Sequence, residues 1–122
     1  VIMTVGGPII TLSNGVQMPQ VGLGTWMCSP AEAKAATKTA IETGYRLIDT
    51  AACYGNEEAI GEAIKELIQA GKVKREELFI TTKLWATHFH RDDVEGATRE
   101  SLRRLQLDYI DLYLAHAPAC FN

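Results

Sequence analysis

Four side chains that can move or stabilise a proton follow one another along this chain: Asp49, Tyr54, Lys83 and His116. Taken singly, each has an ordinary explanation as a helix cap, a packed ring, a solvated charge or a satisfied hydrogen-bonding group. As a set they suit a reaction that builds negative charge on an oxygen, such as hydride transfer to a carbonyl carbon. That reaction needs a proton donor and a group that stabilises the charge.

The four residue types divide this work. Tyr54 is the candidate general acid, and the ammonium of Lys83 would stabilise the phenolate that remains after proton loss. Asp49 would offset the cost of partly burying Lys83. His116 is the candidate substrate orienter, which would hydrogen-bond the carbonyl oxygen as a neutral imidazole.

The residues before these side chains predict strands, and the residues between them predict helices. Asp49, Lys83 and His116 each end a largely apolar stretch, as expected of strands that are covered on both faces. The carboxyl ends of parallel strands form the sites of α/β folds, so these side chains are expected at one end of a sheet. The expected strands are 21–25, 45–49, 78–83 and 109–116; the expected helices are 30–43, 57–69 and 91–105.

A short hairpin is expected at 9–19, ahead of the first strand of the sheet. Asn14 and Gly15 between apolar residues favour a type I′ turn, because both residue types tolerate a positive φ. Pro19 ends the second arm, since it cannot donate to a ladder.

Strands that alternate with helices imply an α/β fold with a parallel sheet and right-handed crossovers. Two architectures fit this pattern, half of an eight-fold barrel or a small doubly wound sheet. The chain has 122 residues, whereas a complete barrel takes about 250. Length by itself therefore favours the open sheet.

Composition argues against several classes of partner. Lys plus Arg is 12 and Asp plus Glu is 15, which gives a net charge of −3 without a basic run, so nucleic acid is not an expected partner. No apolar stretch approaches the roughly 18 residues of a membrane span, and neither a membrane nor a signal peptide is expected. The spacing of Cys28, Cys53 and Cys120 fits neither a disulfide framework nor a zinc knuckle, which favours a reducing, cytoplasmic location.

The residues His88, His90 and Asp92 could suggest a metal site. Their spacing matches no usual zinc pattern, and they lie where the third helix is expected to begin. They are therefore expected to act as loop and cap residues, and no metal is expected. Cys53, next to Tyr54, is expected to be a small buried residue rather than a reactive thiol.

Four longer motifs make the chain resemble a known family. They are VGLGTW (21–26), GYRLIDTAACYGNE (44–57), FITTKLW (79–85) and LDYIDLYLAH (107–116). These motifs resemble the first strands and loops of the aldo-keto reductases, and the similarity runs from about Ile9 to the end of the chain. The resemblance implies the first half of a (β/α)8 TIM barrel, with an N-terminal β-hairpin that closes its bottom, four parallel strands and three helices.

The same resemblance implies NADPH-dependent reduction of aldehydes and ketones to alcohols. Asp49, Tyr54, Lys83 and His116 match the family's catalytic tetrad. A small-molecule carbonyl compound is then the expected partner.

The resemblance also implies contacts around the tetrad. Trp26 and Trp85 are expected to line the substrate pocket together with His116, and Thr25, Trp26 and Asp49 are expected near the nicotinamide ribose. Similar family members often carry Trp after the tetrad His, where this chain has Ala117. The pocket is therefore expected to be wider or less apolar.

The barrel expected from the resemblance is incomplete. In the family the second half supplies most of the grip on NADPH or NADP+, so the chain is expected to be one partial oxidoreductase domain, 1–122. Its parts are the hairpin 9–19 and the first βα units, 21–122. Family members are usually monomeric, but unpaired edge strands favour self-association of a half-barrel. Three alternatives stay open: an oxidoreductase whose other half lies outside this chain, a short chain that assembles with itself or with a second half, and a non-catalytic relic.

Overall fold

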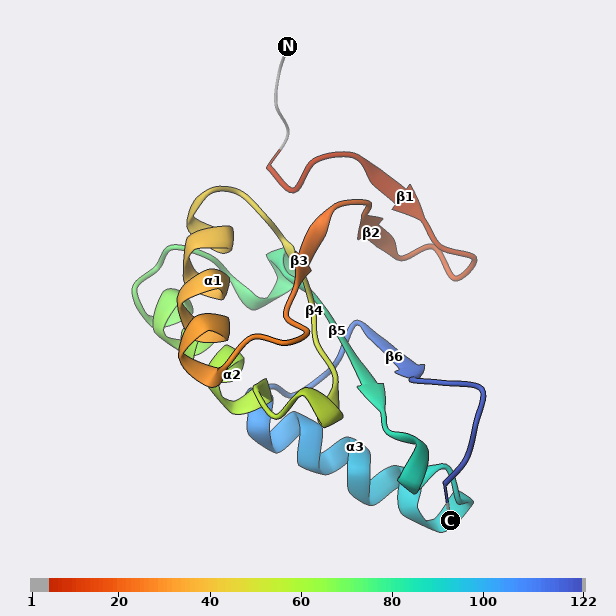
Figure 1. Cartoon of the computed structure of the whole chain (residues 1–122). Coiled ribbons are helices and arrows are strands. Elements are labelled where there is room, and N and C mark those ends of the chain that lie inside the picture. The colour runs from red at the N-terminus through yellow and green to blue at the C-terminus, as the bar shows by residue number, and fades with distance from the viewer. Residues whose placement is uncertain (1–4, 122) are drawn as a thin grey trace.

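The strands of residues 5–121, which are the residues that this computed structural model describes, form two sheets (Figure 1). Strands β1 (Ile9–Thr11) and β2 (Gln17–Pro19) pair antiparallel in a hairpin. Four parallel strands then pair in chain order: β3 (Gly22–Gly24), β4 (Leu47–Asp49), β5 (Phe79–Leu84) and β6 (Leu112–Ala115). The α-helices between them are α1 (Pro30–Glu42), α2 (Glu57–Gln69) and α3 (Arg91–Leu105). Short 3-10 turns, η1 (Ala52–Tyr54), η2 (Arg75–Glu77) and η3 (Ala86–His88), precede α2, β5 and α3.

The start of α1 follows directly from its sequence. The Ser29 hydroxyl accepts a hydrogen bond from the backbone N–H of Glu32, and the Glu32 carboxylate accepts one from the N–H of Ser29. This capping box satisfies two N–H groups that a helix start leaves free, and Pro30 occupies the first helical position. After the helix, Gly44 with φ of 108° turns the chain toward β4.

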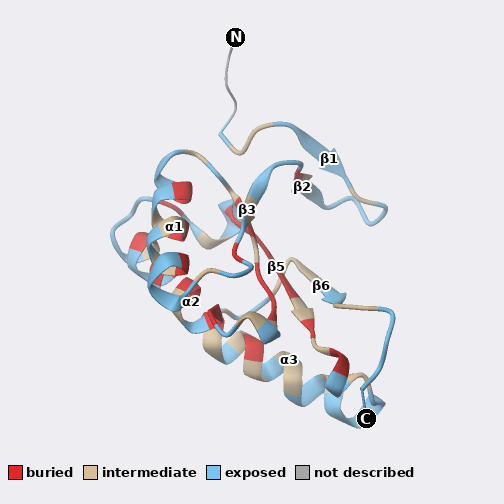
Figure 2. Ribbon diagram, viewed as in Figure 1, coloured by how far each residue is buried: buried red, intermediate tan, exposed pale blue. Residues whose placement is uncertain are grey.

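All three helices pack on the same face of the sheet (Figure 1). Their shared core joins Ile41 of α1, Ile64 of α2 and Leu105 of α3 to Ile48 and Ile80 of the sheet. In Figure 2 the buried parts of the helices and of β4 and β5 face one another. A doubly wound sheet carries helices on both faces, whereas a barrel carries them on the outside only. The cover on one face identifies the sheet as the first half of a barrel, as the resemblance implied, and excludes the open sheet.

The register of the strands decides which side chains face away from the helices. Successive side chains of a strand point to opposite faces. Ile48 and Ile80 point to the helices, so Asp49 and Lys83 point to the other face, which is the inside of a barrel. Lys83 lies opposite Leu114 of β6. The inner face thus carries catalytic candidates at the carboxyl ends of neighbouring strands.

The turn of the hairpin differs from the sequence prediction. Strand β1 ends at Thr11 and β2 begins at Gln17, so the connection spans 12–16. Gly15 has φ of 84°, but Asn14 is not among the residues with positive φ. Its side-chain oxygen accepts a hydrogen bond from the N–H of Val16 at 3.1 Å. That bond stabilises the turn in place of a second positive φ, so the type I′ prediction was wrong.

The last strand is shorter than the predicted 109–116. The carboxylate of Asp111 accepts hydrogen bonds from Arg75 at 2.7 Å and from the N–H of Ile80 at 2.8 Å. The carbonyl of Tyr109 accepts another from Arg75 at 2.9 Å. These bonds hold the approach to β6 in an irregular path, so the ladder begins at Leu112.

No helix among residues 5–121 combines the length and the apolar character that crossing a membrane requires.

Candidate active site

Lys83 and Asp49 form an ion pair at the carboxyl end of the sheet. The Lys83 Nζ donates to the two carboxylate oxygens at 2.8 and 2.7 Å and to the carbonyl of Thr50 at 2.9 Å. The Lys83 side chain is 14% exposed and that of Asp49 is 35% exposed. An ammonium with three oxygen acceptors around it is fixed in one place.

Tyr54 ends η1 and lies beside this ion pair. The Lys83 Nζ is 5.3 Å from the centroid of the Tyr54 ring. Gly55 follows with φ of 70°, a conformation that lets the chain leave Tyr54 and enter α2. The short turn therefore holds the phenol next to the cation.

His116 follows β6 and lies between two aromatic rings. Its backbone N–H donates to the carbonyl of Leu84 at 3.1 Å, which extends the pairing of β6 with β5. The imidazole makes edge contacts with Tyr54, at 5.7 Å between ring centroids, and with Trp85, at 5.1 Å. Such contacts restrict ring orientation. The structure thus brings Tyr54, Trp85 and His116 together.

Cys53 also reaches His116, which the sequence did not predict. Its Sγ lies 3.6 Å from the His116 Nδ1, and the residue is exposed. The expectation of a small buried residue was wrong, because Cys53 lies in the 3-10 turn η1 and not in the sheet. Although the residue is exposed, partial burial of its sulfur raises the pKa of the Cys53 thiol above the ordinary value. The sulfur therefore keeps its proton at neutral pH.

Trp26 and Thr25 lie in the loop after β3 and differ sharply in exposure. Trp26 is 71% exposed, whereas Thr25 is fully buried. The Thr25 hydroxyl donates to the carbonyl of Asp49 at 3.0 Å. Thr25 therefore supports the backbone of Asp49 directly. The cofactor contacts expected of Thr25 and Trp26 stay predictions.

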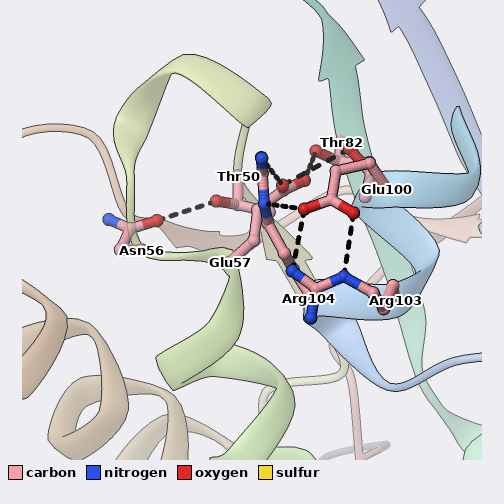
Figure 3. Close-up of polar contacts among 8 residues, drawn as sticks. Thr50, Asn56, Glu57, Thr82, Glu100, Arg103 and Arg104 are labelled. Carbon is pink, nitrogen blue, oxygen red and sulfur yellow. Dashed lines mark hydrogen bonds and ion pairs between the residues drawn. The ribbon is translucent and has the colours of Figure 1, made fainter. Parts of the chain in front are cut away.

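Two buried polar residues that follow Tyr54 in the sequence were missed by the sequence analysis (Figure 3). Asn56 and Glu57 are each 1% exposed. Asn56 accepts a hydrogen bond from the hydroxyl of Thr50 at 3.0 Å, and Glu57 accepts one from the hydroxyl of Thr82 at 2.7 Å. Polar residues at a helix start ordinarily indicate a cap, so their sequence position gave no sign of this buried role.

Of the metal candidates His88, His90 and Asp92, His90 caps a helix, as predicted. The side chain of His90 precedes α3 and accepts a hydrogen bond from the backbone N–H of Asp92. His88 lies 2.9 Å from the hydroxyl of its neighbour Thr87. Within residues 5–121 the structure contains no group of three or more His, Cys, Asp or Glu side chains close enough to hold a metal ion.

The sequence profile of the Aldo/keto reductase family matches residues 20–121. This chain belongs to that family. Aldo-keto reductase family 1 member A1 of Rattus norvegicus is 56% identical over 114 residues, which are 93% of this chain and 35% of the rat protein. The Homo sapiens protein of the same name is also 56% identical, over the same shares of both chains.

The fold of the aldo-keto reductases agrees with the structure. A crystal structure of a Bombyx mori aldo-keto reductase in complex with NADP matches with a TM-score of 0.92 and 49% identity. The match covers 98% of this chain and 41% of the silkworm protein. The chain thus spans 35% of the length of the curated relatives and 41% of that structure. Both the family and the partial barrel expected from the sequence are confirmed.

Proposed function

We propose that this chain provides the acid–base residues of a site that reduces aldehydes and ketones to alcohols with NADPH. The observation that carries the proposal is the Lys83 ammonium, which bonds both oxygens of Asp49 and lies 5.3 Å from the centroid of the Tyr54 ring. A phenol close to both a fixed cation and an imidazole is suited to protonating an oxygen that gains negative charge. The proposal makes the whole protein an oxidoreductase of the aldehyde reductase type.

Tyr54 is the general acid in this proposal. NADPH supplies a hydride to the carbonyl carbon when it is bound. As negative charge develops on the carbonyl oxygen, the Tyr54 hydroxyl gives it a proton, and the Lys83 ammonium stabilises the resulting phenolate. Asp49 holds Lys83 beside the ring and offsets the cost of its partial burial.

His116 orients the carbonyl oxygen. The Cys53 thiol keeps its proton at neutral pH and lies 3.6 Å from the His116 Nδ1, so it can donate to that nitrogen. A neutral imidazole that accepts at Nδ1 carries its own proton on Nε2, which is then the donor to the substrate. The edge contacts with Tyr54 and Trp85 support this orientation.

The residues present fit one end of NADPH better than the other. The indole of Trp26 and the partly exposed carboxylate of Asp49 are suited to the nicotinamide and its ribose. The loops after β3 and β4, residues 25–29 and 50–56, carry no Lys or Arg that could pair with phosphate. We therefore assign the nicotinamide end to this chain and the phosphates to residues outside it.

The pocket residues proposed on this chain are Trp26, Trp85 and His116. Trp85 is half-buried against His116 and also contacts Phe121, at 6.2 Å between ring centroids. Ala117 leaves open a position where similar family members often carry Trp, which favours bulkier or more polar carbonyl compounds.

We further propose that the hairpin 9–19 closes the bottom of the barrel, that 21–122 forms its first βα units, and that the protein works in the cytoplasm.

A chimera tests the proposed activity. This chain is joined to the portion of the rat relative that it does not span, and loss of NADPH absorbance is followed with an aromatic aldehyde. We expect turnover by the chimera and none by the chain alone, because the phosphate contacts are absent from it. Tyr54→Phe removes the proton donor and should lower kcat by about 10²- to 10⁴-fold.

Tyr45→Phe is the matched control for Tyr54→Phe. Tyr45 precedes β4 and is 41% exposed, so its hydroxyl is not expected to affect kcat. The proposal fails if the chimera folds, as judged by circular dichroism, yet consumes no NADPH. It fails equally if Tyr54→Phe keeps the kcat of the parent chimera.

A further inference from the structure

Asn56 stands where a helix cap is expected but does not cap. It is the residue before α2 and follows Tyr54 by two positions, yet its side chain makes no hydrogen bond to the free N–H groups of the helix start. It is 1% exposed. A buried side-chain amide needs hydrogen-bond partners, and the amide of Asn56 does not find them at the start of its own helix. Its partners lie in other segments of the chain.

The amide of Asn56 bridges two segments far apart in the sequence. Its Oδ1 accepts a hydrogen bond from the Thr50 hydroxyl at 3.0 Å, which Figure 3 shows. Its Nδ2 donates to the carbonyls of Thr25 at 2.9 Å and of Cys28 at 3.2 Å. Carbonyl oxygens only accept hydrogen bonds, so the NH2 group of Asn56 must face the carbonyls of Thr25 and Cys28. The amide oxygen then faces Thr50, which fixes the orientation of the amide.

Each side of the bridge leads to a residue of the proposed site. The carbonyl of Thr50 accepts from the Lys83 ammonium at 2.9 Å, so fixing Thr50 fixes one of the acceptors of Lys83. The carbonyls of Thr25 and Cys28 flank Trp26, so bonds to both hold the loop that presents this indole. One buried amide therefore connects the ammonium beside Tyr54 to the loop of Trp26.

We propose that Asn56 is a positioning residue that sets Lys83 and the Trp26 loop relative to each other. The inference rests on the proposed function, since it assigns both ends of the bridge to carbonyl reduction. Asn56 touches neither substrate nor reacting atoms and acts through Thr50 on one side and through the 25–28 loop on the other. The two sides of the bridge can be removed separately by substitution. Asn56 accepts from the Thr50 hydroxyl on one side and donates to the carbonyls of Thr25 and Cys28 on the other.

The test uses the chimera with the rat relative and compares three variants. Asn56→Ala removes both sides of the bridge, and Thr50→Val removes only the hydroxyl that Asn56 accepts from, at nearly constant volume. Ile64→Ala is the control, because Ile64 is a buried core residue of α2 outside the bridge. It weakens the fold without removing a hydrogen bond to Lys83 or to the 25–28 loop.

Asn56→Ala should lower kcat by about 10- to 100-fold and raise KM for the aldehyde, since misplacement by about 1 Å has effects of that size. Thr50→Val should lower kcat while KM stays near that of the parent, because the bonds to the Trp26 loop remain. Ile64→Ala should keep both constants in the fraction of protein that is folded. In hydrogen exchange, Asn56→Ala should speed exchange of the backbone N–H groups at 25–28 more than Ile64→Ala does.

A fourth variant, Asn56→Asp, adds a pH readout. The new carboxylate keeps an acceptor for Thr50 but, when ionised, opposes the carbonyls of Thr25 and Cys28. Its protonated form can donate to one of them, so kcat relative to the parent should recover as the pH is lowered. A purely structural role would not produce this recovery in folded protein.

The outcomes separate this inference from the proposed function. A parent chimera that folds but does not turn over overturns the proposed function and this inference with it. An active parent overturns only this inference if Asn56→Ala and Thr50→Val keep its kcat and KM. The inference also fails if Ile64→Ala lowers kcat as much as Asn56→Ala does.

Discussion

A carboxylate as deeply buried as that of Glu57 needs several donors around it. Glu57 begins α2 and accepts hydrogen bonds from Thr82 of β5 at 2.7 Å, from Ser101 of α3 at 3.3 Å and from Arg104 of α3 at 3.4 Å. Thr82 is the neighbour of Lys83 along β5. One carboxylate thus joins α2, β5 and α3 (Figure 3).

Removing this carboxylate should strongly destabilise the chain. Glu57→Ala leaves the Thr82 and Ser101 hydroxyls and the Arg104 guanidinium without their shared partner, which should lower the free energy of unfolding by about 3 kcal/mol or more. Urea denaturation followed by circular dichroism measures the change. Glu58→Ala is the control, because Glu58 is exposed one position later, and its loss should lower the free energy by less than about 1 kcal/mol. Equal losses would show that burial of Glu57 contributes nothing.

The sequence carries different amounts of information about these residues. Asp49 and Lys83 end the strands predicted at 45–49 and 78–83, so their pairing could be anticipated from strand order alone. In the structure the Lys83 Nζ lies 2.7 Å from a carboxylate oxygen of Asp49. The catalytic roles themselves stay predictions. Asn56 and Glu57 could not be anticipated, because their burial depends on loops and helices that come from other parts of the chain.

Close contact between α2 and α3 depends on a glycine. A Cβ added at Gly61 would lie 2.6 Å from the backbone carbonyl oxygens of Arg104 and Leu105. Contacts that short do not occur, and the atoms it would meet belong to the backbone, which cannot rotate away. Gly61 therefore sets how closely the two helices approach.

Two matched substitutions test this contact between helices. Gly61→Ala should destabilise the chain by about 1–3 kcal/mol, because overpacking outweighs the better helix propensity of alanine. Gly96→Ala, in the middle of α3, meets nothing within 4 Å and should stabilise by about 0.5–1 kcal/mol. Thermal and urea unfolding of both variants measure the changes. A stabilising Gly61→Ala would contradict the close approach.

The contact between α1 and α2 is sensitive to acid. Glu66 of α2 bonds Lys34 and Lys38 of α1, and these two ammonium groups lower the pKa of its carboxyl to about 2. Because the folded pKa lies below the ordinary value of 4.5, the stabilisation is complete above about pH 4.5 and is lost as the pH falls toward about 2. Glu66→Gln should remove this part of the acid sensitivity. Urea midpoints measured across that range, with and without added salt, check the prediction; an unchanged pH slope would contradict it.

Element boundaries followed from sequence where the signals were local. The helices at 57–69 and 91–105 have the predicted bounds, since their apolar period and their flanking residues lie within the segments themselves. The predictions of a type I′ turn and of a strand that begins at 109 were wrong. In both places a hydrogen bond made by a side chain gives the backbone a different path from the one expected. Asn14 bonds Val16 in the first case, and Arg75 with Asp111 interrupts the strand in the second.

At the scale of the molecule, the sheet has apolar side chains with little cover. Strand β5 is almost fully buried, whereas β6, which pairs with β5, has two half-buried and two exposed residues. Leu114, on the inner face opposite Lys83, is 39% exposed. Among residues 5–121, β3 and β6 each pair with only one neighbouring strand. Edge strands of this kind can pair with other chains.

The edge and inner face of β6 therefore predict self-association of the chain when it is studied alone. Light scattering after size exclusion should give a mass above the 13.4 kDa of one chain, and the mass should rise with concentration. Leu114→Lys should lower it, because a charge on the inner face opposes stacking and edge pairing. Val16→Lys, in the exposed hairpin turn with 41% exposure, is the matched control and should leave the mass unchanged. The chimera with the rat relative should be monomeric, because strands from the added portion would cover the same edges. A monomeric chain alone would mean that its edges are protected by their short length, and a self-associating chimera would place the contact elsewhere.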